Sequence, residues 1–320
     1  MKFLLLKTTD PYRNLAIEEY LLKNSQDDIF MLWQNSPTVV IGKNQNAYAE
    51  INFDYANKSD IRIARRITGG GAVYHDLGNI NYTFITTKKT HGSLDFKAFA
   101  APIIDAISDL GLSAELSGRN DIMIDGYKFS GNAQYTYNDR ILHHGTILFS
   151  GNLDVLSSVL NVDKEKIESK AIKSVRSRVR NLSEYLPTEY NIEDFIKFLS
   201  DFIIKKFDAV AAVLPTDRII DELEVRNRSN AWIFPEKDLA SKYVIKKKRR
   251  FDFGTVEISL QMQNDIIIDA RINGDYFEKQ SVSELEDKLR GSALKRGIAH
   301  DAEKYIFGIT NEEFSSLLFD

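Results

Sequence analysis

A short run from Arg65 to Asp76 has the composition of a loop that binds an anion. Three consecutive glycines, Gly69 to Gly71, follow two arginines and a strand-like segment at residues 61–64. Glycine lacks a Cβ atom, so this backbone can adopt positive φ and come close to a ligand. An arginine pair beside it offers charge-assisted hydrogen bonds to a phosphate or a carboxylate. The pattern predicts an anion-binding loop. A tight β-turn beside an exposed arginine pair is the alternative.

A second segment, residues 118–133, places a lysine where it could neutralise an anion. Asp125-Gly126 between two short apolar runs is typical of a two-residue β-hairpin turn. The hairpin puts Asp121 near the start of one strand and Lys128 on the returning strand. Small residues follow Lys128 closely and leave room for a bulky neighbour. An exposed strand lysine is the alternative for Lys128, and a turn or N-cap role is the alternative for Asp121.

A third segment, residues 140–149, predicts a strand that carries His143 and His144. Adjacent strand residues point to opposite faces of a sheet, so the two imidazoles cannot bind one metal ion together. We expect one to face a pocket and the other to pack inside or meet water.

The glycine loop lies between strands and lacks the glycine spacing of Rossmann and P-loop proteins.

Taken in order, these segments resemble the signature blocks of the lipoate-protein ligase family. The likeness runs from Tyr12 to about Leu186 without large gaps. The sequences that carry it are RRITGGGAVYHD, GRND, KFSG and HHGT, with SVRSRV at 174–179 and Trp33 ahead of TVVIGKNQN. The C-terminal third is similar in kind to that family's small accessory domain.

The resemblance implies a two-step reaction. ATP first activates lipoate, or octanoate, as an acyl-adenylate with release of pyrophosphate, and the acyl group then passes to a lysine of a protein. The enzyme must bring two anions together and neutralise the charge that develops at phosphorus. The resemblance implies that Lys128, a compact cation on a rigid strand, contacts the carboxylate and the α-phosphate in both steps.

A nucleotide site is implied around this lysine. The glycine loop would wall the adenylate through backbone groups, and Asp121 would be a ligand of Mg²⁺. An apolar tunnel would hold the acyl chain, although Trp33 is equally well explained as core. The residues implied to bind ATP or the lipoyl-adenylate are Arg66, Gly69, Gly70, Gly71, Ala72, Val73, Tyr74, His75, Asn79, Asn120, Asp121, Lys128, Gly131, Ala133, His144 and Gly145; those implied to line the lipoyl pocket are Trp33, Val73 and Tyr82.

A basic segment at residues 163–181 is implied to close over the adenylate, and an exposed basic loop is the alternative. The implied protein acceptors are apo lipoyl domains of 2-oxoacid dehydrogenase E2 subunits, the glycine-cleavage H protein, or both. We expect a monomer. The net charge of -4 argues against a general nucleic-acid partner. The basic run Lys246 to Arg250 is too short for an interaction tail and is typical of a solvated edge.

Composition excludes several other classes of protein. The chain has no cysteine, which excludes disulfides, zinc-thiolate sites and acyltransferases that form a cysteine thioester. An apolar stretch of Phe3 to Leu6, ended by Asp10-Pro11, is too short for a signal peptide or a membrane helix, and nothing later approaches a membrane span. We therefore expect a soluble, cytoplasmic protein.

Three alternatives to the ATP-dependent ligase remain open. A lipoyltransferase that accepts only preformed lipoyl-adenylate needs no cysteine. A non-catalytic module that binds lipoate or a nucleotide is disfavoured by the intact lysine and glycine loop. Biotin ligation shares the chemistry, but the basic glycine loop typical of that family, Gly-Arg-Gly-Arg-x-x-Arg, is missing here.

The elements that must position these residues alternate between strand and helix. Strands are predicted at 3–7, 29–34 and 38–41, and helices at 11–20, 96–110 and 191–207, with Asp10 as the N-cap of the first. Beyond residue 245, strands at 251–261 and 266–272 precede helices at 285–289 and 312–319. We predict an α/β (α+β) protein. Residues 1–245 would form a biotin/lipoate ligase-like catalytic domain, a mixed sheet flanked by helices. Residues 246–320 would form a small α+β accessory domain.

Overall fold

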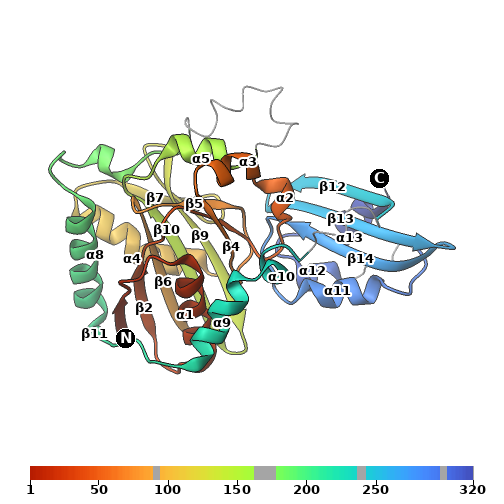
Figure 1. Ribbon diagram of the computed structural model, residues 1–320, viewed down its shortest axis with the longest axis horizontal. Coiled ribbons are helices and arrows are strands. Elements are labelled where there is room, and N and C mark those ends of the chain that lie inside the picture. Colours follow the sequence, from red (N-terminus) through yellow and green to blue (C-terminus); the bar gives the residue numbers. More distant parts are fainter. Residues whose placement is uncertain (89–93, 162–177, 236–242, 296–300, 320) are drawn as a thin grey trace. The chain divides into compact units, whose positions relative to one another are not determined.

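The computed structural model describes residues 1–88, 94–161, 178–235, 243–295 and 301–319 (Figure 1). The chain divides into two compact units. The first comprises Met1–Val40, Tyr48–Arg65 and Val73–Ile233, and the second comprises Ile41–Ala47, Arg66–Ala72 and Phe234–Asp320. The second unit thus includes two short segments from the N-terminal half, and one of them contains the three glycines. The predicted boundary near residue 245 stays a prediction.

The first unit is built on a mixed eight-stranded sheet. The strand order is β11-β1-β2-β6-β10-β9-β8-β7. The β11, β1 and β2 strands run parallel, and every later neighbour in the sheet is antiparallel. In that spatial order the strands are β11 (Val210–Ala211), β1 (Lys2–Leu5), β2 (Ile29–Trp33), β6 (Asn79–Thr87), β10 (Arg140–Leu148), β9 (Tyr127–Tyr137), β8 (Asp121–Ile124) and β7 (Ala114–Ser117).

Helices cover both faces of this sheet. On one face, α4 (Phe96–Asp109) and α8 (Ile192–Phe207) bury aromatic and aliphatic side chains against Phe30, Phe84 and Ile141. On the other face, α1 (Pro11–Asn24) packs against β6 and β10 and is itself covered by α9 (Arg218–Arg228). Burying apolar area on both faces stabilises the sheet, and it leaves the strand edges and ends for function.

The remaining elements of the first unit surround the central sheet. A separate three-stranded sheet has the order β4-β3-β5. The elements are β3 (Thr38–Ile41), β4 (Arg62–Arg65), β5 (Val73–His75), α2 (Ala47–Glu50), α3 (Phe53–Lys58), α5 (Leu153–Val159), the 3₁₀ helix η1 (Leu182–Tyr185) and α10 (Asn230–Ile233).

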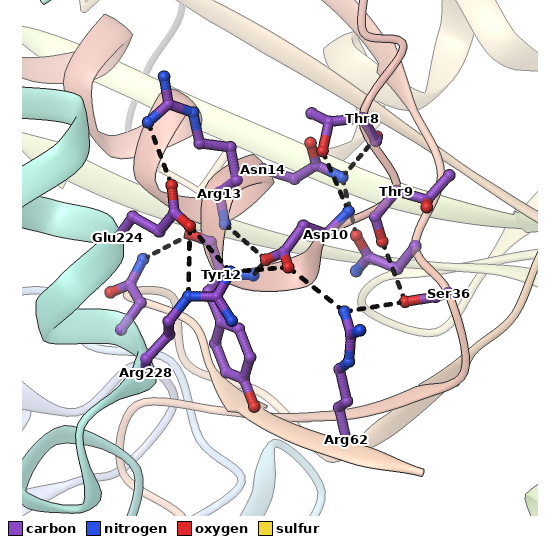
Figure 2. A network of polar contacts seen from close by, with 12 residues as sticks. Thr8, Thr9, Asp10, Tyr12, Arg13, Asn14, Ser36, Arg62, Glu224 and Arg228 are labelled. Carbon is purple, nitrogen blue, oxygen red and sulfur yellow. Dashed lines mark hydrogen bonds and ion pairs between the residues drawn. The ribbon is translucent and has the colours of Figure 1, made fainter. Parts of the chain in front are cut away.

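The start of α1 is fixed by a polar network around Asp10 (Figure 2). The Asp10 carboxylate accepts hydrogen bonds from the backbone N–H groups of Tyr12 and Arg13, as the sequence predicts for an N-cap. It also forms ion pairs with Arg62 at 3.3 Å and Arg228 at 2.8 Å. The Arg228 guanidinium also lies over the Tyr12 ring. Because Arg62 lies in β4 and Arg228 in α9, the Asp10 carboxylate links the start of α1 to both elements.

The second unit contains an antiparallel sheet with the order β12-β13-β14. These strands, β12 (Ile245–Phe251), β13 (Gly254–Gln263) and β14 (Ile266–Gly274), share a core with α11 (Val282–Leu289), α12 (Ala302–Tyr305) and α13 (Asn311–Phe319). The basic run at residues 246–250 lies in β12, an edge strand of this sheet. Charged edge strands resist pairing with other chains, which explains this composition.

The predicted fold class is confirmed, with two corrections to individual elements. The strand expected at 251–261 is broken, because a turn after Phe251 makes Gly254 the partner of that residue in a hairpin. The apolar periodicity continued across this turn, so the pattern alone did not reveal it. Helix α9 was not anticipated, because only Ile220 and Asn227 are buried in it. Among the described helices, none is long and apolar enough to cross a membrane.

Candidate active site

Lys128 and Asp121 meet on one face of the β8–β9 hairpin. The turn residues Asp125 and Gly126 both have positive φ, at 52° and 79°, as a two-residue hairpin turn requires. The Lys128 Nζ lies 2.7 Å from Asp121 Oδ1, and each side chain is 36% exposed. The pair is therefore accessible to a ligand and is held by a charge-assisted hydrogen bond.

A β-bulge gives Lys128 this position. Met123 pairs with Lys128, Ile122 with Ser130 and Asp121 with Gly131, so Phe129 has no partner across the ladder. The extra residue turns Lys128 to the same face as Gly131. A Cβ atom on Gly131 would lie 2.9 Å from Lys128 Nζ, so the lysine side chain occupies the space that this glycine leaves open.

The Lys128 backbone is held on its other side by residues 178–180. Its N–H donates to the Arg178 carbonyl at 2.7 Å, and its own carbonyl accepts from the Arg180 N–H at 3.0 Å. The Arg180 guanidinium lies over the Tyr127 ring at 3.8 Å. Arg178 and Arg180 belong to the described part of the basic segment at 163–181, and residues 162–177 lie outside the described structure. Most of the SVRSRV block lies there too.

A buried polar cluster lies below the hairpin. Asn132 Oδ1 accepts hydrogen bonds from the Tyr82 hydroxyl and, at 3.0 Å, from His143 Nε2. The Tyr82 side chain is fully buried, and burial raises the pKa of its hydroxyl. Burial also lowers the pKa of His143 well below its usual value, and the neighbouring His144 adds to this effect. His143 is therefore neutral, stacked on Phe99 of α4.

His144 points to the opposite face, as predicted for adjacent strand residues. Its Nδ1 lies 2.9 Å from Glu18 of α1, a carboxylate only 1% exposed. Glu18 also accepts from the Thr83 hydroxyl at 2.6 Å, and Thr83 accepts from Trp33 Nε1 at 3.0 Å. Trp33 is thus anchored by its polar atom. Sequence reasoning missed Glu18, although its place among the buried residues of an amphipathic helix was a usable signal.

His75 belongs to another buried polar group. Its Nδ1 lies 3.1 Å from Asn35 Nδ2, and Asn14 donates to Asn35 Oδ1 at 2.9 Å. Burial raises the pKa of Tyr74 to about 12, with Asp76 contributing. Asn79 donates to Asn81 at 3.1 Å. These side chains are held by protein partners, which pre-sets their orientation.

The glycine loop belongs to the second unit and is shaped by Arg66. The guanidinium donates to the carbonyls of Gly69 and Gly71, at 2.7 and 2.8 Å, and to the Thr68 hydroxyl. The neighbouring Arg65 donates to the Ile233 carbonyl, within the first unit. Both arginines predicted to grip an anion therefore hold backbone carbonyls, and Arg66 acts on the loop from within.

The loop packs tightly on one side and is open on the other. Gly70, with a φ of 89°, donates to the Tyr276 carbonyl at 3.2 Å, and a Cβ on Gly69 would overlap that carbonyl oxygen. Gly71 is exposed, and a Cβ there would meet nothing within 4 Å. Lys43 pairs with Glu278 at 2.6 Å beside this loop. The open side is where a ligand can approach the backbone closely.

Two family models cover most of the chain. Residues 10–204 match the lipoyl protein ligase A/B catalytic domain, and residues 240–318 match the bacterial lipoate protein ligase C-terminus. The lipoate-protein ligase LplJ of Bacillus subtilis is 39% identical over 97% of both chains. Lipoate-protein ligase 1 of Staphylococcus aureus is 39% identical over 88% of this chain and 87% of its own.

Solved structures agree with these relatives. The structure of LipL1 from P. falciparum in complex with lipoate has a TM-score of 0.79, with 26% identity, over 92% of this chain and 90% of its own. A lipoate-protein ligase A bound with ATP has a TM-score of 0.62, with 26% identity, over 73% of this chain and 98% of its own. A bipartite ligase from Thermoplasma acidophilum, studied with its E2 lipoyl domain, has a TM-score of 0.66 with 28% identity, over 73% of this chain and 95% of its own.

The fold and these matches define an enzyme of the ligase class. The chain belongs to the lipoate-protein ligase family.

Proposed function

We propose that this protein activates lipoate with ATP to lipoyl-adenylate and then transfers the lipoyl group to a lysine of an acceptor protein. The observation that carries the proposal is the Lys128–Asp121 pair, accessible on the open face of a rigid hairpin above Gly131. Relatives crystallised with lipoate and with ATP support the two small ligands.

In the activation step, a carboxylate oxygen of lipoate attacks the α-phosphorus of ATP. The bond to the β-phosphate oxygen breaks, and pyrophosphate leaves. Both reactants are anionic, and negative charge builds up on the phosphoryl oxygens. The Lys128 side chain would move from Asp121 to these oxygens, and its positive charge would stabilise the transition state.

In the transfer step, the neutral amine of the acceptor lysine attacks the acyl carbon. An amide bond forms, the mixed anhydride breaks and AMP leaves with the bonding electrons. The proposed role of Lys128 here is to stabilise the departing phosphate and the carbonyl oxygen. The glycine loop would contact the adenylate through backbone groups on its open side, at Gly71 and Ala72.

Magnesium fits this site as a partner of the nucleotide. Mg²⁺ binds nucleotides through phosphate oxygens and waters with one or two protein carboxylates. Asp121 offers one partly exposed carboxylate for this. Among the described residues, no group of three or more acidic or histidine side chains could hold a metal by itself. The proposed ion would therefore arrive with ATP, and it would neutralise phosphate charge when bound.

Trp33, Val73 and Tyr82 are proposed to line the pocket that holds the acyl chain. The proposed acceptors are apo lipoyl domains of 2-oxoacid dehydrogenase E2 subunits and the glycine-cleavage H protein. The archaeal relative studied with its E2 lipoyl domain supports the first of these.

The test is a carrier-mass assay with two substrates for the acyl group. Apo lipoyl domain is incubated with the protein and either ATP, Mg²⁺ and lipoate, or preformed lipoyl-adenylate alone. We expect the carrier mass to rise by one lipoyl group in both, and pyrophosphate to form only in the first. A gain in the second incubation but none in the first would instead identify a lipoyltransferase. No gain in either would contradict catalysis. Apo H protein in parallel separates the acceptors.

A further inference from the structure

Asn132 connects the buried polar cluster to the Lys128–Asp121 pair. Three hydrogen bonds join Asn132 to Asn120, the residue before Asp121. The Asn132 backbone N–H donates to the Asn120 carbonyl at 2.8 Å, and Asn132 Nδ2 donates to the same carbonyl at 3.0 Å. In return, Asn120 Nδ2 donates to the Asn132 carbonyl at 2.7 Å. The start of β8 is thus held to β9 by side chains as well as by backbone.

We propose that Asn132 is a positioning residue, which holds the start of β8 so that Asp121 stays opposite Gly131 and within reach of Lys128. This inference rests on the proposed function, since it assigns Asn132 its effect through Lys128. No contact of Asn132 with a substrate is involved.

The Asn132 side chain can serve this purpose because its amide has one possible orientation. Its oxygen accepts from both the Tyr82 hydroxyl and His143 Nε2. The amide nitrogen therefore faces Asn120, where a carbonyl needs a donor. An amide turned by half a rotation would set an N–H against the His143 Nε2–H and the amide oxygen against the Asn120 carbonyl.

Neutral His143 supports the same orientation. Gln134 Nε2 donates to His143 Nδ1 at 2.9 Å, so the single ring proton lies on Nε2 and is donated to Asn132. Gly145 completes the arrangement, because a Cβ there would overlap Asn132 Oδ1 and the Tyr82 ring. Four residues from three strands, together with Asn120 just before β8, thus fix one amide, which is the kind of supporting shell that rigid catalytic geometry requires.

The main test is Asn132→Asp, which is nearly isosteric. The carboxylate can still accept from Tyr82 and His143, but it turns an oxygen toward the Asn120 carbonyl. One of the three hydrogen bonds to Asn120 is thereby replaced by a repulsive contact between two oxygens. We expect kcat for lipoate-dependent pyrophosphate release to fall by about tenfold or more, the effect of one lost buried hydrogen bond. The KM values for ATP and lipoate should change little. Tyr82→Phe, a milder variant that keeps the fold, should lower kcat in the same way by a few fold, roughly.

The matched control is Asn227→Asp in α9. Asn227 is also buried and also donates to a backbone carbonyl, that of Tyr12. In the described structure its side chain forms hydrogen bonds with Arg226 and Tyr12, which lie outside the proposed site. We expect it to lower the unfolding temperature without a fall in kcat at a temperature where it is folded. An equal fall in kcat in the control would overturn the inference.

A double-mutant cycle separates positioning from a general structural effect. If Asn132 acts through Lys128, Asn132→Asp should cost much less in a Lys128→Ala background than in the wild type. Losses that multiply in the double variant would overturn the inference. So would an unchanged kcat in Asn132→Asp.

One readout needs no catalysis. Backbone amide exchange at residues 119–123 should be faster in Asn132→Asp than in the wild type, and unchanged in Asn227→Asp. If exchange is faster in Asn132→Asp but the wild-type protein has no ligase activity, the proposed function is refuted. The positioning of Asn120 by Asn132 is then still supported. Unchanged exchange, with an active wild type, would refute the inference and leave the function standing.

Discussion

At the scale of single residues, the site depends on side chains whose charge is set by their surroundings. Lys128 and Asp121 compensate each other at an accessible position, whereas His143 and Tyr82 stay neutral because they are buried. A charged pair near solvent can exchange one anion for another at low cost. The neutral buried cluster does not bind the incoming anion and keeps its hydrogen bonds, so it serves as a fixed support.

Replacing Lys128 tests the reactive half of this arrangement. Lys128→Ala should slow lipoate-dependent pyrophosphate release by roughly a hundredfold or more, about 3 kcal/mol, as for the loss of one preorganised donor to a developing charge. Pyrophosphate release under saturating substrates measures it. Lys197→Ala, at an exposed position on α8, is the control and should be without effect. Activity within a few fold of wild type in Lys128→Ala would remove the lysine from the mechanism.

His143 gives the supporting half a dependence on pH. Its pKa is lower in the folded protein than in the unfolded chain, so the unfolded state binds more protons below about pH 6.5. Stability is therefore full above that pH and falls as the pH decreases, by about 1.4 kcal/mol per unit for this group until its folded pKa is reached. We expect the free energy of unfolding, measured with urea between pH 7.5 and 5.5, to change less with pH in His143→Gln than in wild type. Equal slopes would contradict a neutral buried His143.

At the level of elements, the hairpin contributes a side chain to the proposed site and the glycine loop contributes backbone groups. The β8–β9 hairpin carries its functional side chain on a strand, where a bulge at Phe129 sets its direction. The loop contributes backbone, and Arg66 holds its shape from inside through two carbonyls. Within this loop, Gly69 is needed for packing and Gly71 faces open space.

The two glycines should therefore respond differently to a side chain. Gly71→Val should keep the unfolding temperature near that of wild type and weaken adenylate binding by about tenfold or more, because the valine fills the side from which a ligand approaches. Gly69→Val should lower the unfolding temperature, because its side chain meets the Tyr276 carbonyl. Calorimetric titration with a non-hydrolysable lipoyl-adenylate analogue and thermal unfolding measure the two effects. Unchanged affinity in folded Gly71→Val would rule out close approach at this position.

At the scale of the whole molecule, the order of the chain and the grouping of its contacts differ. The motif blocks lie before residue 190, yet residues 41–47 and 66–72 belong to the same compact unit as the C-terminal strands. Gly70 donates to Tyr276, and Lys43 pairs with Glu278. The loop predicted to bind the nucleotide is thus shaped partly by residues from the end of the chain.

A chain that ends at residue 245 should show this dependence. It lacks the Tyr276 carbonyl and Glu278, so we expect it to form lipoyl-adenylate at least about tenfold more slowly than the full chain. Transfer from supplied lipoyl-adenylate should be affected less, because Lys128 and its supporting cluster lie in the first unit. Circular dichroism establishes that the shortened protein is folded. Activation at the full-length rate, or loss of transfer with activation kept, would contradict this division.

Features that depend on local spacing could be predicted from the sequence. Asp125-Gly126 predicted the turn, Asp10 predicted the start of α1, and the adjacent histidines predicted side chains on opposite faces. The blocks around the glycines and Lys128 identified the family. Each of these follows from backbone geometry over a few residues, so no distant part of the chain is needed to infer it.

Which side chains support one another became evident from the three-dimensional structure. The bulge that turns Lys128 toward Gly131 depends on the register of two strands, and the place of Asn132 depends on Tyr82 and His143 from two further strands. The fold also brings backbone carbonyls to Arg65 and Arg66, and their role in holding an anion stays a prediction. Register and packing are set by contacts between distant residues, which no short pattern in the chain contains.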